Sequence, residues 1–146
     1  MLNIENLTTH TINHLLLERI AKSQTEREID LTICYNSTIQ EYNKLYRNKD
    51  KATDVLSFPI DNDIIGLDEN IMPLGAIVIS IDYAIEKAKE FGHQSNEEIA
   101  LLFIHGLLHI RGYDHECDNG EMRKKEKEMI HTFSLPKSLI IRTEGN

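Results

Sequence analysis

The amino-acid sequence predicts an α+β fold, in which helices pack a small mixed β-sheet around one central, buried helix. Short β-branched segments such as 75–80 alternate unevenly with longer segments of helical periodicity. From Ile99 to Leu108 almost every side chain is apolar, which is typical of a helix enclosed by other elements. The length of 146 residues and the 40% hydrophobic content fit a single domain spanning 1–146. An α/β arrangement of the same small sheet is the alternative.

Four strands are expected. Leu2 and Ile4 alternate with polar neighbours, and a second alternation covers 31–35. A third strand runs over 55–58 until Pro59 stops it, and a fourth over 75–80. The long connection between the last two predicts an antiparallel or edge pairing. Within it, Asp61, Asp63 and Gly66 weakly resemble a calcium loop, but Ile65 and Met72 stand where oxygen ligands are required.

The first two expected helices are amphipathic. Thr8 or Thr9 can cap a helix that runs to about residue 22, and Asn36 or Ser37 can cap a second to about residue 46. The buried stripe expected in the first helix consists of Ile12, Leu15, Leu16, Arg19 and Ile20. The buried side expected in the second helix consists of Ile39, Tyr42, Leu45 and Tyr46.

Three further helices are expected in the second half of the chain. One begins at Ser80 or Asp82 and ends near Phe91. Ser95 with Glu98 forms a predicted capping box for the buried helix, and Asp118 with Glu121 forms another for a terminal helix to about residue 133. The apolar side of the terminal helix consists of Met122, Met129, Ile130 and Phe133.

The net charge of −8 argues against broad, non-specific binding of nucleic acid. Two local basic clusters remain: one at Lys44, Arg47, Lys49 and Lys51, and one at Arg111, Arg123, Lys124, Lys125 and Lys127. No apolar run is long enough to span a bilayer and no signal-peptide pattern is present, so we expect a cytoplasmic protein without membrane contact. Cys34 and Cys117 are expected to be free thiols.

Three histidines follow the spacing H-x-x-x-H-x-x-G-x-x-H from His105 to His115. His105 and His109 share one helix face, and Gly112 can turn the chain so that His115 reaches the same point. The central helix is therefore expected to carry two metal-ligand histidines. Three imidazoles with a fourth position for water make a catalytic zinc site. A structural site with Asp114 or Cys117 as fourth ligand is the alternative.

Other histidines and one glycine limit this interpretation. His10 and His14 repeat the helical spacing without a third ligand and are expected at the surface, as is His131. His93 is expected at the surface or at the C-terminal end of a helix. The motif spacing matches the metal ligands of the metzincin peptidases, which carry a glutamate base directly after the first histidine. Here that position is Gly106, so peptide hydrolysis by that route is disfavoured. A glycine inside a helix also predicts a close approach by another element.

Three segments together resemble the YbeY family of bacterial endoribonucleases, the rRNA maturation factors. They are the histidine motif, residues 46–50 followed by 53–59, and residues 74–80. The resemblance implies a hydrolase that contains one Zn²⁺ per chain and cleaves single-stranded RNA. It also implies a cytoplasmic role in 16S rRNA 3′-end maturation and ribosome quality control, with RNA presented on the ribosome or by a partner protein. The oligomeric state is left open.

The resemblance assigns metal binding to His105, His109 and His115, and a catalytic role to Arg47. A guanidinium near the metal can hold a phosphate by two parallel hydrogen bonds. Asp54 and Asp114 are candidates for orienting a ligand imidazole through its other nitrogen. Ala76 departs from the family, whose members commonly have aspartate after Leu-Gly.

Two other functional classes remain open. One is a zinc-dependent hydrolase of a peptide or a small molecule, and the other is a ribosome-associated protein in which the metal only stabilises the fold. The histidines alone do not distinguish zinc from nickel or another divalent ion, because imidazole suits several metals.

Overall fold

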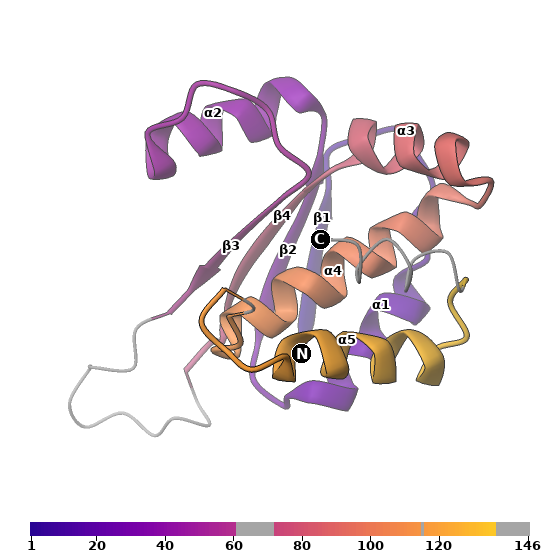
Figure 1. Ribbon diagram of the computed structural model, residues 1–146. Helices are drawn as coiled ribbons and strands as arrows, with labels where there is room; N and C mark the ends of the chain where they lie inside the picture. Colours follow the sequence, from indigo (N-terminus) through magenta and orange to yellow (C-terminus); the bar gives the residue numbers. More distant parts are fainter. Residues whose placement is uncertain (61–71, 115, 137–146) are drawn as a thin grey trace.

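The computed structural model describes residues 1–60, 72–114 and 116–136. In these ranges the strands form one sheet in the order β1-β2-β4-β3. β1 (Leu2–Asn6), β2 (Ile29–Cys34) and β4 (Gly75–Ser80) run parallel, and β3 (Val55–Pro59) runs antiparallel to β4 at the sheet edge. The mixed sheet of an α+β fold and the antiparallel edge pairing are therefore confirmed (Figure 1).

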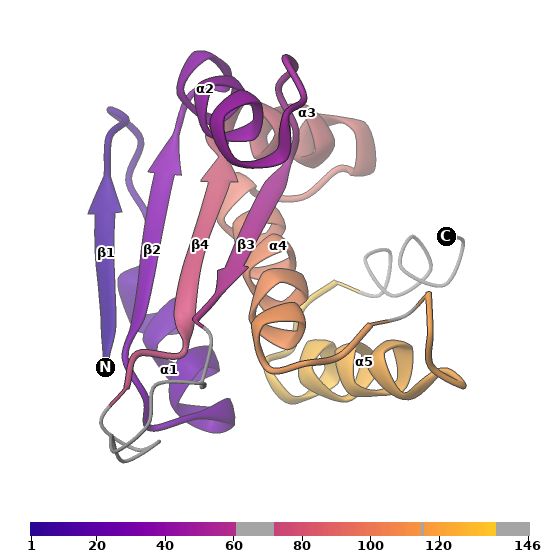
Figure 2. The same cartoon turned by 90° about the vertical axis from the view of Figure 1, so that its left-hand side faces the viewer.

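Helices cover both faces of this sheet (Figure 2). The helices of the described ranges are α1 (His14–Gln24), α2 (Asn36–Arg47), α3 (Ile81–Phe91), α4 (Ser95–Ile110) and α5 (Glu121–Thr132). Ile77 and Ile79 of β4 join the main core with α1 and α4, whereas Val78 packs with Ile39 of α2 on the other face. This alternation follows from the opposite directions of successive strand side chains.

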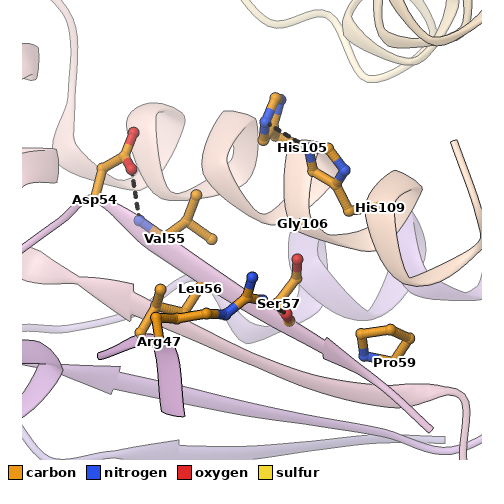
Figure 3. A pocket seen from close by; sticks show the side chains of 9 residues that line it. All are labelled: Arg47, Asp54, Val55, Leu56, Ser57, Pro59, His105, Gly106 and His109. Atoms are coloured by element: carbon orange, nitrogen blue, oxygen red, sulfur yellow. Dashed lines mark hydrogen bonds between the residues drawn. The ribbon is translucent and has the colours of Figure 1, made fainter. Parts of the chain in front are cut away.

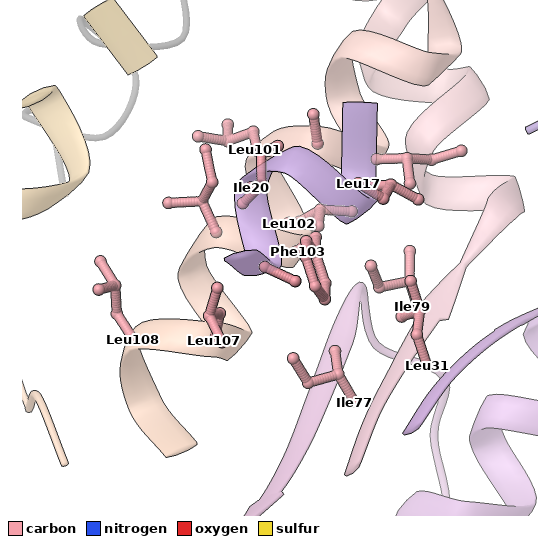
Figure 4. Close-up of a cluster of buried hydrophobic side chains, with 14 of the residues drawn as sticks. Leu17, Ile20, Leu31, Ile77, Ile79, Leu101, Leu102, Phe103, Leu107 and Leu108 are labelled. Atoms are coloured by element: carbon pink, nitrogen blue, oxygen red, sulfur yellow. The ribbon is translucent and has the colours of Figure 1, made fainter. Parts of the chain in front are cut away.

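The central helix α4 is enclosed as predicted. Every residue from Glu98 to Ile104 is buried, and its apolar side chains contact those of α1 and the sheet (Figure 4). A Cβ atom at Gly106 would lie 3.0 Å from Ile77 Cγ2 and 3.4 Å from Val55 Cγ2. The close approach expected at this glycine is therefore confirmed. Glycine lets α4 lie directly against β3 and β4, although it costs about 1 kcal/mol in helix propensity.

The predicted start of the first helix was wrong. α1 begins at His14, where the Asn13 side chain accepts a hydrogen bond from the Leu16 amide at 3.1 Å. The earlier threonine Thr8 is instead held in a turn by the Asn6 side chain. The later start also corrects the buried stripe: Leu17 is buried, whereas Leu15 is exposed.

The buried side predicted for α2 was also partly wrong. Leu45 and Tyr46 are exposed, and the buried residues are Ile39 and Asn43. The Asn43 side chain donates to the Lys51 carbonyl at 2.9 Å. A buried amide that fixes a loop thus occupies the place expected for an apolar residue.

The capping residues of α4 differ by one position from the prediction. Gln94 and Glu97, not Ser95 and Glu98, exchange the two hydrogen bonds of the capping box. Glu98 instead turns inward, where its Oε2 lies 3.4 Å from His93 Nε2. Both side chains are buried, so the surface position expected for His93 was wrong.

Of the two residues in the capping box predicted for α5, only Asp118 accepts a hydrogen bond from the first turn of the helix. Asp118 accepts from the Met122 amide at 2.9 Å, but Glu121 bonds the Asn119 amide rather than reaching back to a cap residue. Gly120 occupies the cap position with φ 99°. The buried residues of α5 include Met122, Met129 and Ile130, as predicted.

The remaining predictions concern the cysteines, three histidines and one acidic segment. Cys34 is buried, Cys117 is exposed, and both are free thiols as predicted. His10, His14 and His131 are exposed as predicted. The calcium-like segment from Asp61 to Gly66 lies outside the described residues. Among the helices that the structure describes, none is both long and apolar enough to cross a membrane.

Candidate metal centre

His105 and His109 lie one turn apart on α4 and direct their rings toward each other (Figure 3). Their Nε2 atoms are 3.1 Å apart, and the ring planes meet at 75°. Two nitrogens bound to one tetrahedral zinc at about 2.0–2.1 Å would be about 3.3–3.4 Å apart. The observed spacing is close to this value, so the pair fits a shared cation after a small adjustment.

Glu126 of α5 holds the other side of the first imidazole. Its Oε1 lies 2.7 Å from His105 Nδ1, and its side chain is buried. A carboxylate at Nδ1 favours the tautomer in which Nδ1 carries the proton and Nε2 keeps its lone pair. His105 Nε2 is then the nitrogen available to a metal ion.

The two histidines line a cavity of about 410 Å³ between α4 and β3. Its wall comprises Arg47, Asp54, Val55, Leu56, Ser57, Pro59, His105, Gly106 and His109 (Figure 3). His109 also lines a second cavity of about 450 Å³, together with Gly112, Tyr113, Asp114 and Glu116. His109 is therefore reachable from two sides, although α4 itself is mostly buried.

Arg47 is the last residue of α2 and extends toward the histidines from the opposite wall of the cavity. Its Nη2 donates to the Ser57 carbonyl at 2.6 Å, and its Cζ lies 5.4 Å from the centre of the Phe58 ring. The edge strand β3 thus fixes the guanidinium. The structure brings Arg47, His105 and His109 to one cavity, as the sequence motifs predicted.

The third predicted ligand, His115, lies outside the described residues. In the ranges that the structure does describe, no group of three histidine, cysteine or carboxylate side chains is placed to hold a metal ion. Gly112 has φ 100°, so the predicted turn after α4 is present. Binding by His115 therefore stays a prediction.

The two aspartates expected near the ligands have other bonds. Asp54 accepts from the Val55 amide at 2.8 Å and braces the start of β3, although it also lines the histidine cavity. Asp114 accepts from the Glu116 amide at 3.0 Å. Its hydrogen bond to Cys117 raises the pKa of that exposed thiol. The orienting carboxylate at His105 is Glu126 instead.

Sequence reasoning missed Glu126, although the chain carries a signal for it. Glu126 is four residues after Met122 and four before Ile130, so a carboxylate stands inside an apolar stripe of α5. A buried acid in such a place needs a polar partner. That partner is His105.

Ala76, where the resemblance to the family predicted aspartate, pairs with Phe58 of β3. Alternation along β4 directs Ala76 to the α2 face, because Ile77 contacts Gly106 on the α4 face. The departure therefore removes no group from the wall of the sheet that faces the histidines.

Comparisons with known proteins place the chain in a family. The model of a family described as endoribonuclease YbeY matches residues 2–134. Endoribonuclease YbeY of Sulfurovum sp. is 51% identical, over 99% of this chain and 98% of its own length. The protein of the same name from Aliarcobacter butzleri is 56% identical, over 97% of this chain and 99% of its own.

A solved structure agrees with the fold. The solution structure of a Thermotoga maritima protein superposes with a TM-score of 0.61 at 28% identity, covering 91% of this chain and 89% of the other. The sequence and structural matches extend over nearly the whole chain. The chain belongs to the YbeY family of endoribonucleases.

Proposed function

We propose that this protein is a metal-dependent endoribonuclease that cleaves single-stranded RNA in the cavity between α4 and β3. One observation carries the proposal: His105 and His109 converge within the same cavity that Arg47 lines. Family membership supports RNA as the substrate. The cavity contains two histidines that could bind one metal ion, and the Arg47 guanidinium that could bind a phosphate.

The residues fit one Zn²⁺ held by His105 and His109, with His115 as the proposed third ligand. When bound, such an ion lowers the pKa of a water molecule to about 7 and polarises a phosphoryl oxygen. Glu126 would orient His105 by accepting the Nδ1 proton. The exposed Cys117 and the bonded Asp114 are less suited to close the fourth position.

Arg47 is the proposed catalytic residue that holds the scissile phosphate. Its contact with the Ser57 carbonyl uses one Nη2 hydrogen and sets the direction of the guanidinium. Its other N–H groups can donate to two phosphate oxygens and stabilise the negative charge that develops during attack. Gly106 lines the same cavity and adds no side chain to it.

We further propose a role in 16S rRNA 3′-end maturation and ribosome quality control in the cytoplasm. The family supports this role. A chain with net charge −8 should bind free RNA weakly, because affinity depends on cationic contacts to phosphate. Presentation of the RNA by the ribosome or by a partner protein would supply the missing affinity.

Arg47→Ala tests the mechanism. The variant should keep its metal and lose about 10²–10³-fold in cleavage rate, the loss typical of one donor to a developing oxyanion. Elemental analysis and cleavage of a labelled single-stranded RNA measure the two effects, with Lys89→Ala, in α3 and outside the cavity wall, as the basic control. Cleavage by Arg47→Ala at the wild-type rate would exclude the phosphate role.

The same preparation separates the other functional classes. A chelator should abolish RNA cleavage, and readdition of zinc should restore it. Hydrolysis of peptides but not RNA by the metal-loaded protein would favour a different hydrolase. A large loss of thermal stability on metal removal, with no cleavage in either state, would favour a purely structural metal.

A further inference from the structure

A group of three aromatic rings, which we call the aromatic ledge, lies where α2 meets β3, with two rings half-buried and one exposed. It consists of Tyr42, Tyr46 and Phe58. Tyr42 and Tyr46 stack with ring centres 6.1 Å apart and an angle of 20°, and Tyr46 meets the Phe58 ring edge-on at 5.4 Å. Tyr46 is nevertheless 60% exposed. Its neighbours hold the ring in place while much of its surface faces solvent.

Arg47 joins this ledge to the cavity. It follows Tyr46 in the chain, and its guanidinium lies 5.4 Å from the Phe58 ring centre and bonds the Ser57 carbonyl. Ser57 and Pro59, on either side of Phe58, both line the histidine cavity. A ligand whose phosphate is at Arg47 therefore has the ledge within reach of its adjoining nucleotide.

The charge around the ledge also suits a phosphate-bearing strand. Residues 41–51 contain four basic residues and two acidic ones, although the whole chain has net charge −8. Lys44 and Asp50 are exposed and form only a long ion pair of 3.9 Å. This end of α2 is thus a local basic surface next to an exposed ring, a combination typical of sites for single-stranded nucleic acid.

We propose that Tyr46 stacks against one unpaired nucleobase of the RNA strand whose phosphate lies at Arg47. The inference rests on the proposed function and deepens it by giving a physical reason for preferring single strands. A base within a duplex is stacked between its neighbours and cannot lay its face on a side chain, whereas an unpaired base can.

Binding measurements on the full chain test the stacking site apart from cleavage. In a His109→Ala background, the affinity for a fluorescently labelled single-stranded RNA decamer is read from anisotropy. Tyr46→Ala should raise Kd about 5- to 150-fold, the range expected for one stacked base. Tyr46→Phe and Tyr46→Trp should stay within about twofold of the parent, because both keep an aromatic face.

Leu45→Ala is the matched control. Leu45 is the preceding residue on the same helix end and is 74% exposed, but it has no ring. Its substitution should leave Kd unchanged. A set of decamers, each with one abasic nucleotide at a different position, provides a double-mutant cycle between protein and RNA. For one of these decamers Tyr46→Ala should no longer raise Kd, because the base that Tyr46 contacts is already absent.

Specific results would overturn the proposal. They are a Kd for Tyr46→Ala within twofold of the parent, an equal loss in Leu45→Ala, or a loss in Tyr46→Phe that points to the hydroxyl. Cleavage by the wild-type protein with no effect at Tyr46 rejects the stacking site alone. Tyr46-dependent binding by a wild-type protein that never cleaves RNA supports the stacking site and rejects the proposed reaction.

Discussion

Each half of α4 takes part in a contact between a histidine and a buried glutamate, but only the second pair opens into a cavity. Near the helix start, His93 Nε2 lies 3.4 Å from Glu98 Oε2, with side chains 5% and 0% exposed. Further along, His105 Nδ1 lies 2.7 Å from Glu126 Oε1, with side chains 35% and 3% exposed. The residue types are the same, while their surroundings differ.

A histidine–glutamate contact alone does not make a reactive site. In the first pair both side chains are enclosed, and their contact joins the turn before α4 to the helix itself. In the second pair the carboxylate occupies Nδ1, so Nε2 faces His109 and the cavity. Whether such a pair can take part in chemistry depends on the surroundings of the ring nitrogen that does not contact the glutamate.

Among the variants of the two pairs, His109→Ala should reduce metal binding and RNA cleavage most, because it removes the side chain that faces His105 Nε2. Metal content should fall well below one per chain, and RNA cleavage should fall more than about 100-fold, since losing a ligand costs more than losing a ligand's carboxylate partner. Elemental analysis and a cleavage assay measure both. His93→Gln, in the enclosed pair, should remain loaded and active. Full metal content in His109→Ala would refute the site.

Glu126→Gln should weaken the open pair without removing a ligand. The amide does not carry the negative charge that favours a proton on His105 Nδ1, so metal affinity should fall about 10–100-fold. Competition with a chelator of known affinity gives the dissociation constant. Unchanged affinity would show that Glu126 serves only to pack α5.

Glu98→Ala should affect stability rather than chemistry. Removing one member of a buried pair costs about 3 kcal/mol, and Tm should therefore fall by about 6–12 °C. Thermal unfolding followed by circular dichroism measures the change. Metal content and cleavage well below Tm should match the wild type; a matching loss of metal would mean that the two pairs are coupled through α4.

The two cysteines repeat the contrast between enclosed and open positions on a smaller scale. Burial, with a further contribution from the Asp82 charge, raises the pKa of the Cys34 thiol to about 11. At pH 8 only about one molecule in a thousand then has the reactive thiolate. Iodoacetamide should modify exposed Cys117 first and Cys34 only after unfolding, as read by mass spectrometry. Equal rates in the native protein would contradict this.

Much of the fold could be predicted because apolar periodicity records burial. The strand pattern and the enclosed α4 followed from it, since they depend on side chains that all meet one core. Helix ends could be predicted only in part: Ser80 caps α3 and Phe91 ends it as expected, whereas two other starts differ because a cap depends on which neighbouring polar group makes the hydrogen bond. Asn13 rather than Thr8 begins α1, and Gln94 with Glu97 begins α4. Tyr46 was expected on the buried side of α2 because its ring is largely apolar, but the ring belongs to an exposed surface.

Sequence could predict only those residues of the candidate site that are linked by helical spacing or by a local motif. Helical spacing and the family motif brought His105, His109 and Arg47 to one cavity. Glu126 comes 21 residues after His105 on another helix, so no local pattern links the two. His93 gave no sign of burial, because its enclosure depends on Glu98 turning inward after the cap shifts by one residue.

The position of Glu126 on α5 links metal binding to the susceptibility of the protein to proteolysis. This helix packs on α4 through Met122, Met129 and Ile130, and its carboxylate contacts the imidazole proposed to hold the ion. Ion occupancy and docking of α5 are then thermodynamically linked, so each favours the other. A molecule that has lost its ion would open this helix more often and expose it to proteases, so emptied copies would be degraded before loaded ones.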